Sequence, residues 1–253
     1  MTGKELSITF VGHSTVLLQS REVAIVTDPN YETSFGPFVP RLEAPGMGIE
    51  DLPRLTLVLI SHDHFDHLSR STLRALPGGY RLLIPKGTGH LFRGLNHRTQ
   101  HELDHGKTYQ DWQVKVTALP ALHVSKRLLL GRSRPANNYL IELHGKTIFF
   151  AGDTGYGPQF REIGAAWDID AALLPVGLAT PDFLFGKTHL NPERALRAFR
   201  DLQARIMIPI HYGTFRTVLE KPDYPLQELR RQIARYDMGE KVKILRPGES
   251  IHL

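Results

Sequence analysis

The residues with the clearest chemical potential lie in one short segment, residues 61–67, which reads SHDHFDH and holds three histidines and two aspartates. The segment follows directly on the apolar run of residues 55–60. Imidazoles and carboxylates are costly to bury, and they gain little from crowding on a surface. A bound cation reverses that balance, because each of these groups then becomes a ligand. The segment therefore predicts a metal site at the end of a buried strand.

The spacing within the segment favours two neighbouring ions over one. His62 and His64 are two residues apart, which places both side chains on the same side of an extended segment. Asp66 and His67 are adjacent, so their side chains point in different directions. One turn can in this way supply ligands to two ions.

Three further candidate ligands follow strands that we expect at residues 114–119, 148–152 and 206–210. Sites in layered α/β folds gather at the carboxyl ends of strands, where loops converge over a rigid support. Five histidines and two aspartates suit two divalent cations with one carboxylate bridging them; zinc fits a ring of histidines best, and manganese and iron are also compatible. The predicted metal ligands are His62, His64, Asp66, His67, His123, Asp153 and His211.

The order of the apolar runs predicts the elements that position these ligands. In each half of the chain a hairpin leads to an aspartate, Asp28 or Asp153, and then to a buried strand at residues 55–60 or 171–175. This internal similarity predicts an α/β fold, a four-layered α/β/β/α sandwich of two pseudo-repeated halves with the helices outside. Two helices are expected, at residues 68–76 with Ser69 as a cap and at residues 192–205 with Asn191 as a cap.

The composition is that of an ordinary globular protein, with 41% hydrophobic and 23% charged residues, and we expect one domain over residues 1–253. The absence of cysteine excludes disulfides, a thiolate zinc site and a cysteine nucleophile, and it fits a reducing cytosol. The first residues lack a signal-peptide pattern, and no apolar run approaches the roughly 20 residues that span a bilayer. A cytoplasmic protein without a transmembrane segment is therefore expected. The net charge of +5 favours anionic partners, and a mildly basic soluble protein is the alternative, since no block of five like charges appears.

The order and spacing of the candidate ligands resemble the metal pattern of the metallo-β-lactamase superfamily, His-x-His-x-Asp-His followed by a histidine, an aspartate and a final histidine. Longer blocks at residues 11–16, 120–125, 149–156 and 208–215 resemble the branch that contains N-acyl phosphatidylethanolamine phospholipase D and the ascorbate-6-phosphate lactonases. The segment HLNPERA at residues 189–195 is similar to a block of the phospholipase.

The resemblance implies how the ligands divide between the ions. One metal would take His62, His64 and His123, the other Asp66, His67 and His211, and Asp153 would bridge them together with a water or hydroxide. Two cations lower the pKa of that water toward neutrality, and the hydroxide attacks a phosphoryl or carbonyl centre.

Three further residues receive roles of lesser weight. His189 resembles a pocket histidine of the family that protonates a leaving group or binds a phosphate, so Asp66, Asp153 and His189 form the predicted catalytic set; a surface histidine at a helix start is the alternative. His13 either orients a ligand or serves the turn that contains it. Asp28 is expected to hold a loop. The remaining histidines fit no ligand position: His90, His97, His101, His105, His144 and His252.

The leading functional hypothesis is a hydrolase of an anionic phosphodiester, such as an N-acyl phosphatidylethanolamine-like phospholipid. The basic and apolar segment 126–132 could meet such a substrate or a membrane surface, and a solvated loop is its alternative. A lactonase or carboxylic ester hydrolase acting on a small anionic molecule is the second hypothesis. A nuclease is disfavoured because no stripe of aromatic and basic residues is visible. A non-catalytic metal-binding protein and a homo-oligomer stay open.

Overall fold

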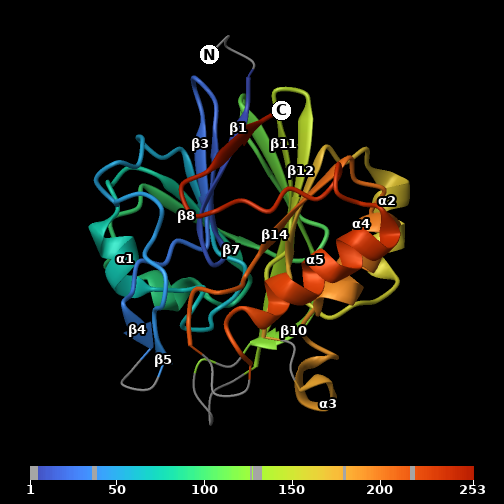
Figure 1. Ribbon diagram of the computed structural model, residues 1–253. Helices are drawn as coiled ribbons and strands as arrows, with labels where there is room; N and C mark the ends of the chain where they lie inside the picture. The colour runs from blue at the N-terminus through green and yellow to red at the C-terminus, as the bar shows by residue number, and fades with distance from the viewer. Residues whose placement is uncertain (1–4, 36–38, 126, 128–132, 179–180, 217–219) are drawn as a thin grey trace.

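The computed structural model describes residues 5–35, 39–125, 127, 133–178, 181–216 and 220–253. Two β-sheets lie face to face, with α1 outside one sheet and α2, α4 and α5 outside the other (Figure 1). The helices are α1 (Arg70–Ala75), α2 (Gln159–Ala166), α3 (Asp182–Phe185), α4 (Pro192–Asp201) and α5 (Tyr224–Tyr236), with a short 3₁₀-helix, η1, at Gly89–Phe92. The predicted four-layered sandwich is confirmed.

The first sheet has seven strands, in the spatial order β15 (Ser250–His252), β1 (Ser7–Gly12), β2 (Thr15–Gln19), β3 (Ala24–Thr27), β6 (Leu57–Leu59), β7 (Arg81–Pro85) and β8 (Thr99–Leu103). The second has six, in the order β14 (Ile206–Ile210), β13 (Ala171–Pro175), β12 (Lys146–Phe150), β11 (Arg134–Leu143), β10 (Val114–Ser125) and β9 (Thr108–Gln110). A separate hairpin joins β4 (Ser34–Phe35) and β5 (Val39–Pro40).

Strand pairing shows the internal repeat that the sequence predicts. In the first sheet β1, β2 and β3 pair antiparallel, and β6 and β7 follow in parallel. In the second sheet β10, β11 and β12 pair antiparallel, and β13 and β14 follow in parallel. Each half thus begins as a meander and ends as parallel crossovers, which place several strand ends at one edge of the sandwich.

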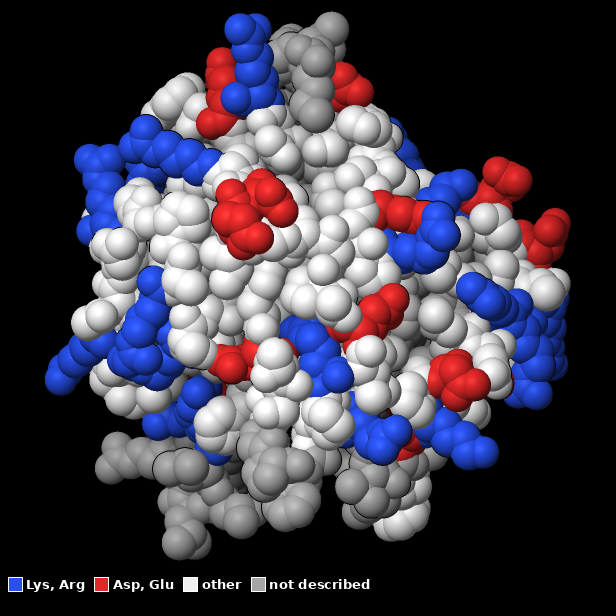
Figure 2. Space-filling model, turned by 60° about the vertical axis from the view of Figure 1, so that its left-hand side comes forward, with Lys and Arg blue, Asp and Glu red and all other residues white. Residues whose placement is uncertain are grey.

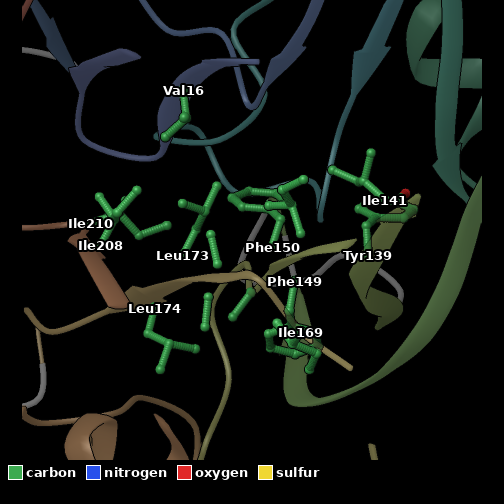
Figure 3. Packing of buried hydrophobic residues seen from close by; sticks show 14 of the residues in the cluster. Val16, Tyr139, Ile141, Phe149, Phe150, Ile169, Leu173, Leu174, Ile208 and Ile210 are labelled. Carbon is green, nitrogen blue, oxygen red and sulfur yellow. The ribbon is translucent and has the colours of Figure 1, made fainter. Parts of the chain in front are cut away.

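Alternation along the strands explains why the runs of the first sheet are apolar throughout. Ile25 contributes to the core between the sheets, whereas its neighbour Val26 packs in a second cluster with Leu73 of α1. A sheet that is covered on both faces needs apolar residues at every position. The core between the sheets is filled from both sides, as shown by Val16 and Phe150 (Figure 3).

Two element boundaries differ from those expected. The strand predicted at residues 55–60 is shorter, Leu57–Leu59, although backbone hydrogen bonds to β3 and β7 also involve Thr56 and Ile60 on either side of it. The helix predicted to reach residue 205 ends at Asp201. Gln203 has a φ of 52°, in the left-handed region, which stops the helix and turns the chain into β14. Both predicted caps are confirmed, since Ser69 accepts from the Thr72 amide and Asn191 from the Arg194 amide.

A buried tyrosine fastens the two sheets together beside the histidine-rich segment. The hydroxyl of Tyr139, on β11, donates a hydrogen bond to the carbonyl of Ile60 at 2.8 Å. The backbone N–H of Asn137 donates a second bond to the Ser61 carbonyl, also at 2.8 Å. These bonds fix the point at which β6 ends and residues 61–67 begin.

Among the described residues, each helix is too short or too polar to cross a lipid bilayer.

We expect Tyr139→Phe to lower the free energy of unfolding by about 1–3 kcal/mol, because a buried carbonyl loses its donor while the ring remains. Urea denaturation of both proteins measures the difference. Tyr31→Phe is the matched control, since the Tyr31 hydroxyl is buried without a hydrogen-bond partner among the described residues. Equal stability of the Tyr139 variant and the wild type would contradict the role given to this hydroxyl.

Candidate metal centre

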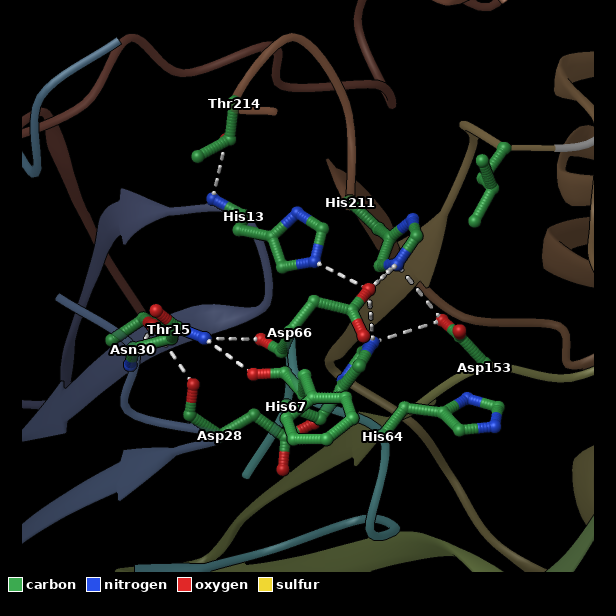
Figure 4. A network of polar contacts seen from close by, with 12 residues as sticks. His13, Thr15, Asp28, Asn30, His64, Asp66, His67, Asp153, His211 and Thr214 are labelled. Atoms are coloured by element: carbon green, nitrogen blue, oxygen red, sulfur yellow. Dashed lines mark hydrogen bonds and ion pairs between the residues drawn. The ribbon is translucent and has the colours of Figure 1, made fainter. Parts of the chain in front are cut away.

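The predicted ligands meet at the edge of the sandwich where β6, β12 and β14 end (Figure 4). Residues 61–67 follow β6, Asp153 follows β12 and His211 follows β14. His123 was expected after the strand at residues 114–119. It lies within that strand instead, because β10 continues to Ser125. The pairing of β10 with β11 is irregular between Pro120 and Val124, and such a bulge re-aims a side chain within a strand.

The first group of ligand atoms belongs to His62, His64, His123 and Asp153, and these atoms all lie within 4.8 Å of one another. The Nδ1 atom of His64 is 3.0 Å from Nε2 of His62 and 3.2 Å from Nε2 of His123. Three imidazoles from two separate segments therefore converge on one point, with the Asp153 carboxylate beside them.

The second group consists of His13, Asp66, His67 and His211, again within 4.8 Å. Oδ2 of Asp66 is 3.2 Å from Nε2 of His13, 3.4 Å from Nε2 of His211 and 3.5 Å from Nε2 of His67. The resemblance assigned Asp66, His67 and His211 to one metal, and the structure places these three together. It adds His13, whose role the sequence left open.

Asp153 lies between the two groups and faces each with a different oxygen. Its Oδ1 is 3.4 Å from Nε2 of His67 and 3.2 Å from Nε2 of His211. Its Oδ2 is 3.8 Å from Nε2 of His62 and 3.3 Å from Nε2 of His189. A carboxylate in this position suits a bridge between two neighbouring ions.

Buried atoms without partners test whether these residues fit metal ions. Among the described residues, Nε2 of His67, Nε2 of His211 and Oδ1 of Asp153 are buried and form no hydrogen bond, although the carboxylate oxygen faces the two nitrogens at 3.4 and 3.2 Å. An unsatisfied buried polar atom costs about 1–3 kcal/mol. Cations held between the groups would satisfy these three atoms, so the donor set fits divalent ions.

The imidazoles of the two groups do not all carry the same charge, since burial lowers the pKa of His13 in the second group to about 3. Burial lowers the pKa of His62 well below 6.5 and that of His123 to about 4, which keeps both rings in the neutral form that binds metals. Burial also lowers the pKa of His67, but the charges of Asp153 and Asp66 outweigh it and raise that pKa well above 6.5. Burial raises the pKa of Asp153, and the charges of His211 and His67 bring it well below its usual value.

Asp28 orients ligands of both groups, which the sequence did not predict. Its Oδ2 accepts hydrogen bonds from Nδ1 of His67 at 2.7 Å and from the Ser61 hydroxyl at 2.6 Å, and its Oδ1 accepts from the Ser61 amide at 2.7 Å. The Ser61 hydroxyl also lies 2.9 Å from Nδ1 of His62. Asp28 is thus fully buried behind the ligands, and it holds the start of the loop 61–67 as expected while it also orients His67.

His13 and His189 border the centre from opposite sides. The His13 ring lies 4.1 Å from the His211 ring, centroid to centroid, and its backbone carbonyl accepts from the His211 amide at 2.8 Å. His189 is buried beside His123 and Asp153, with ring centroids 5.1 Å apart for the histidine pair. The alternative that His189 is a surface residue at a helix start is therefore wrong. The six histidines expected to be bystanders belong to none of the ligand groups formed by the described residues.

A pocket of about 340 Å³ opens beside the second group. Its walls are mainly apolar, and the predicted ligands His64, Asp66 and His211 border it together with His13. The apolar side chains come from four separate segments, which is why the sequence did not reveal them: Phe35, Val39, Phe65, Leu178 and Phe215. Of the segment 126–132, only Arg127 lies within the described residues, and its guanidinium stacks on Phe65 at 4.2 Å.

Comparison with known proteins identifies the class that this fold and site define. Residues 24–212 match the family described as the Beta-lactamase superfamily domain, which is most of the chain. The chain therefore belongs to the β-lactamase superfamily.

Curated relatives cover the chain to different extents. An uncharacterized protein of Mycobacterium tuberculosis is 34% identical over 239 residues, which are 88% of this chain and 63% of that protein. The N-acyl-phosphatidylethanolamine-hydrolyzing phospholipase D 1 of Caenorhabditis elegans is 29% identical, over 83% of this chain and 64% of that protein. The chain thus spans less than two thirds of the length of these relatives. A metal-dependent hydrolase of Geobacillus is 29% identical over 98% of this chain and 100% of its own length.

Solved structures support the fold. The isothiocyanate hydrolase from Delia radicum gut bacteria superposes with a TM-score of 0.78 at 22% identity, covering 97% of this chain and 98% of that one. The metallo hydrolase Igni18 of Ignicoccus hospitalis superposes with a TM-score of 0.70 at 21% identity, covering 98% of each chain. At this identity the likeness concerns the fold.

We expect Asp28→Asn to lower metal affinity about 10- to 100-fold, as loss of a hydrogen bond behind a ligand does elsewhere. The side-chain amide of asparagine cannot accept hydrogen bonds from the Ser61 backbone N–H, the Ser61 hydroxyl and His67 together, because its nitrogen is a donor. Metal retained per chain against a graded chelator measures the change. Asp168→Asn, an exposed position, is the matched control. Unchanged retention in the Asp28 variant would contradict its role in orienting the ligands.

Proposed function

We propose that this protein hydrolyses phosphodiesters that carry an apolar group, with two divalent metal ions, zinc foremost, bound at the centre described above. The observation that carries the proposal is the pair of ligand groups that share Asp153 beside an apolar pocket. A pair of ions a few ångströms apart suits attack on a phosphoryl centre, which has both an attacking and a leaving oxygen to stabilise.

The chain's residues divide the work between the ions. His62, His64 and His123 would hold one ion, and Asp66, His67 and His211 would hold the other, with Asp153 between them. Bound divalent ions supply Lewis acidity and a nucleophile derived from water at neutral pH.

His189 is suited to protonate the leaving group. Its Nε2 lies 3.3 Å from Oδ2 of Asp153, at the border of the first group, and its Nδ1 lies 3.1 Å from the Thr188 hydroxyl. That contact fixes the ring, so Nε2 faces the space beside the centre. A proton held at Nε2 could pass to an oxygen that departs from a substrate bound there.

The apolar pocket indicates where the non-reacting part of the substrate would lie. Phe35, Phe65 and Phe215 form much of its wall, and the candidate ligands form one side of it. A substrate with a phosphodiester at the ions and an alkyl, acyl or aryl group among these rings would bury both parts. The similarity to the phospholipase of Caenorhabditis elegans supports an N-acylated phospholipid as one such substrate.

Turnover of bis(4-nitrophenyl) phosphate, by protein reconstituted separately with zinc and manganese, tests the proposal. We expect hydrolysis by the wild type and a loss of about 100-fold or more in Asp153→Ala, since the shared carboxylate is removed. Asp168→Asn should retain full turnover. If protein shown to hold two ions per chain cleaves 4-nitrophenyl acetate or a lactone and leaves the phosphodiester intact, an ester hydrolase replaces the phosphodiesterase.

A comparison of leaving groups tests His189. His189→Ala should reduce the cleavage of a short-chain phosphatidylethanolamine, whose alkoxide needs a proton, about 100-fold. Cleavage of bis(4-nitrophenyl) phosphate should change little, because 4-nitrophenolate departs without a proton. Metal content must equal that of the wild type in the same preparation. An equal loss with both substrates would contradict the proton-donor role.

A further inference from the structure

A second pocket lies at the other end of the first sheet. Its residues come from the turn between β2 and β3, the approach to β6, the start of β7, the approach to β8 and the turn before β10, and its volume is about 520 Å³. These are the amino ends of parallel strands, whereas the metal centre lies at the carboxyl ends. The pocket is therefore separate from the site described above.

Four arginines line this pocket, Arg21, Arg54, Arg81 and Arg98, against a single acidic lining residue, Glu22. Basic side chains gather at several places on the face seen in Figure 2, so positive charge alone does not distinguish a site. The distinguishing feature is that four arginines from separate segments line one hollow. Like charges placed together in this way repel one another unless an anion joins them.

Most of these guanidinium groups have no carboxylate partner among the described residues. Within the described part of the chain, the ion pairs closer than 4.0 Å include Arg81 with Asp111, at 3.4 Å, and none of Arg21, Arg54 or Arg98. Guanidinium groups bind phosphate oxygens through paired, parallel hydrogen bonds. The open donors therefore suit a ligand with two or more phosphate charges.

Trp112 adds an aromatic surface to the same pocket. Its side chain is 81% exposed, which is unusual for so large an apolar group. The turn that carries it is fixed, because Oδ1 of Asp111 accepts from the amides of Gln113 and Val114 at 2.8 and 3.0 Å, and Oδ2 of Asp111 faces Arg81. An indole held open beside arginines offers a stacking surface for a planar ring next to a phosphate site.

We propose that this pocket is a second ligand site, which binds a nucleoside di- or triphosphate with its phosphates on the arginines and its base on Trp112. A volume of about 520 Å³ lies within the usual range for small-molecule sites. The site uses none of the metal ligands, so it does not depend on the hydrolytic function proposed above.

Calorimetric titration of the metal-loaded protein with ADP, pyrophosphate and adenosine tests the site. We expect ADP to bind one to one, pyrophosphate to bind roughly tenfold more weakly because it cannot stack, and adenosine to show no binding. Binding of ADP should also quench the fluorescence of Trp112. The substitution Trp112→Ala should lower the affinity for ADP to that for pyrophosphate.

Charge-removing variants locate the binding. Arg54→Gln combined with Arg98→Gln should weaken ADP binding at least tenfold and make the binding less dependent on salt concentration. Phosphodiester turnover should stay unchanged. Arg74→Gln combined with Arg230→Gln removes the same charge at exposed positions outside the pocket and should leave ADP affinity intact.

Three results would overturn the proposal. One is ADP affinity that falls with Asp153→Ala and not with the pocket variants, which would place the nucleotide at the metal centre. Another is equal affinity for ADP and pyrophosphate with no effect of Trp112→Ala, which would remove the base from the site. The third is a single-stranded oligonucleotide that binds through the same arginines far more tightly than ADP, which would make the pocket part of a nucleic-acid surface.

Discussion

The carboxylate of Asp153 is the group on which the rest of this structure depends. It is buried, it lies between two groups of imidazoles, and it faces each group with one oxygen. A charge in that position is stable only if the surrounding groups compensate it, and the charges of His211 and His67 hold its pKa well below the usual value. The two halves of the chain meet at this residue, because His67 comes from the end of β6 and His211 from the end of β14.

Such a cluster requires support from behind, because isolated histidine rings rotate freely. Asp28 supplies it by bonding His67 directly and His62 through Ser61, and the Thr188 carbonyl bonds Nδ1 of His123 at 3.1 Å. The tie between Tyr139 and Ile60 holds the sheets in register at the same place. Groups outside the candidate ligand set thus determine how these imidazoles are oriented, which is the usual requirement of a preorganised site.

Opposite ends of the sandwich carry side chains of opposite charge. The carboxyl ends of the parallel strands gather carboxylates and imidazoles suited to cations, whereas the amino ends gather arginines suited to anions. The strands between them belong to a core that is buried on both faces and packs tightly. A rigid support of this kind lets loops at either end vary without disturbing the other end.

The sequence by itself determined the strand-ending aspartates and histidines, the two helix caps and the internal repeat, because these depend on local spacing and on runs of apolar residues. These patterns predict the sandwich fold and the seven candidate ligands, which lie close together in the structure. Tertiary structure alone decided which side chains join them. His13 and Asp28 lie in the first 28 residues, and their approach to His211 and His67 follows from sheet pairing across the chain. The bulge in β10 that aims His123, and the pockets lined from four or more segments, likewise arise from contacts that no local pattern encodes.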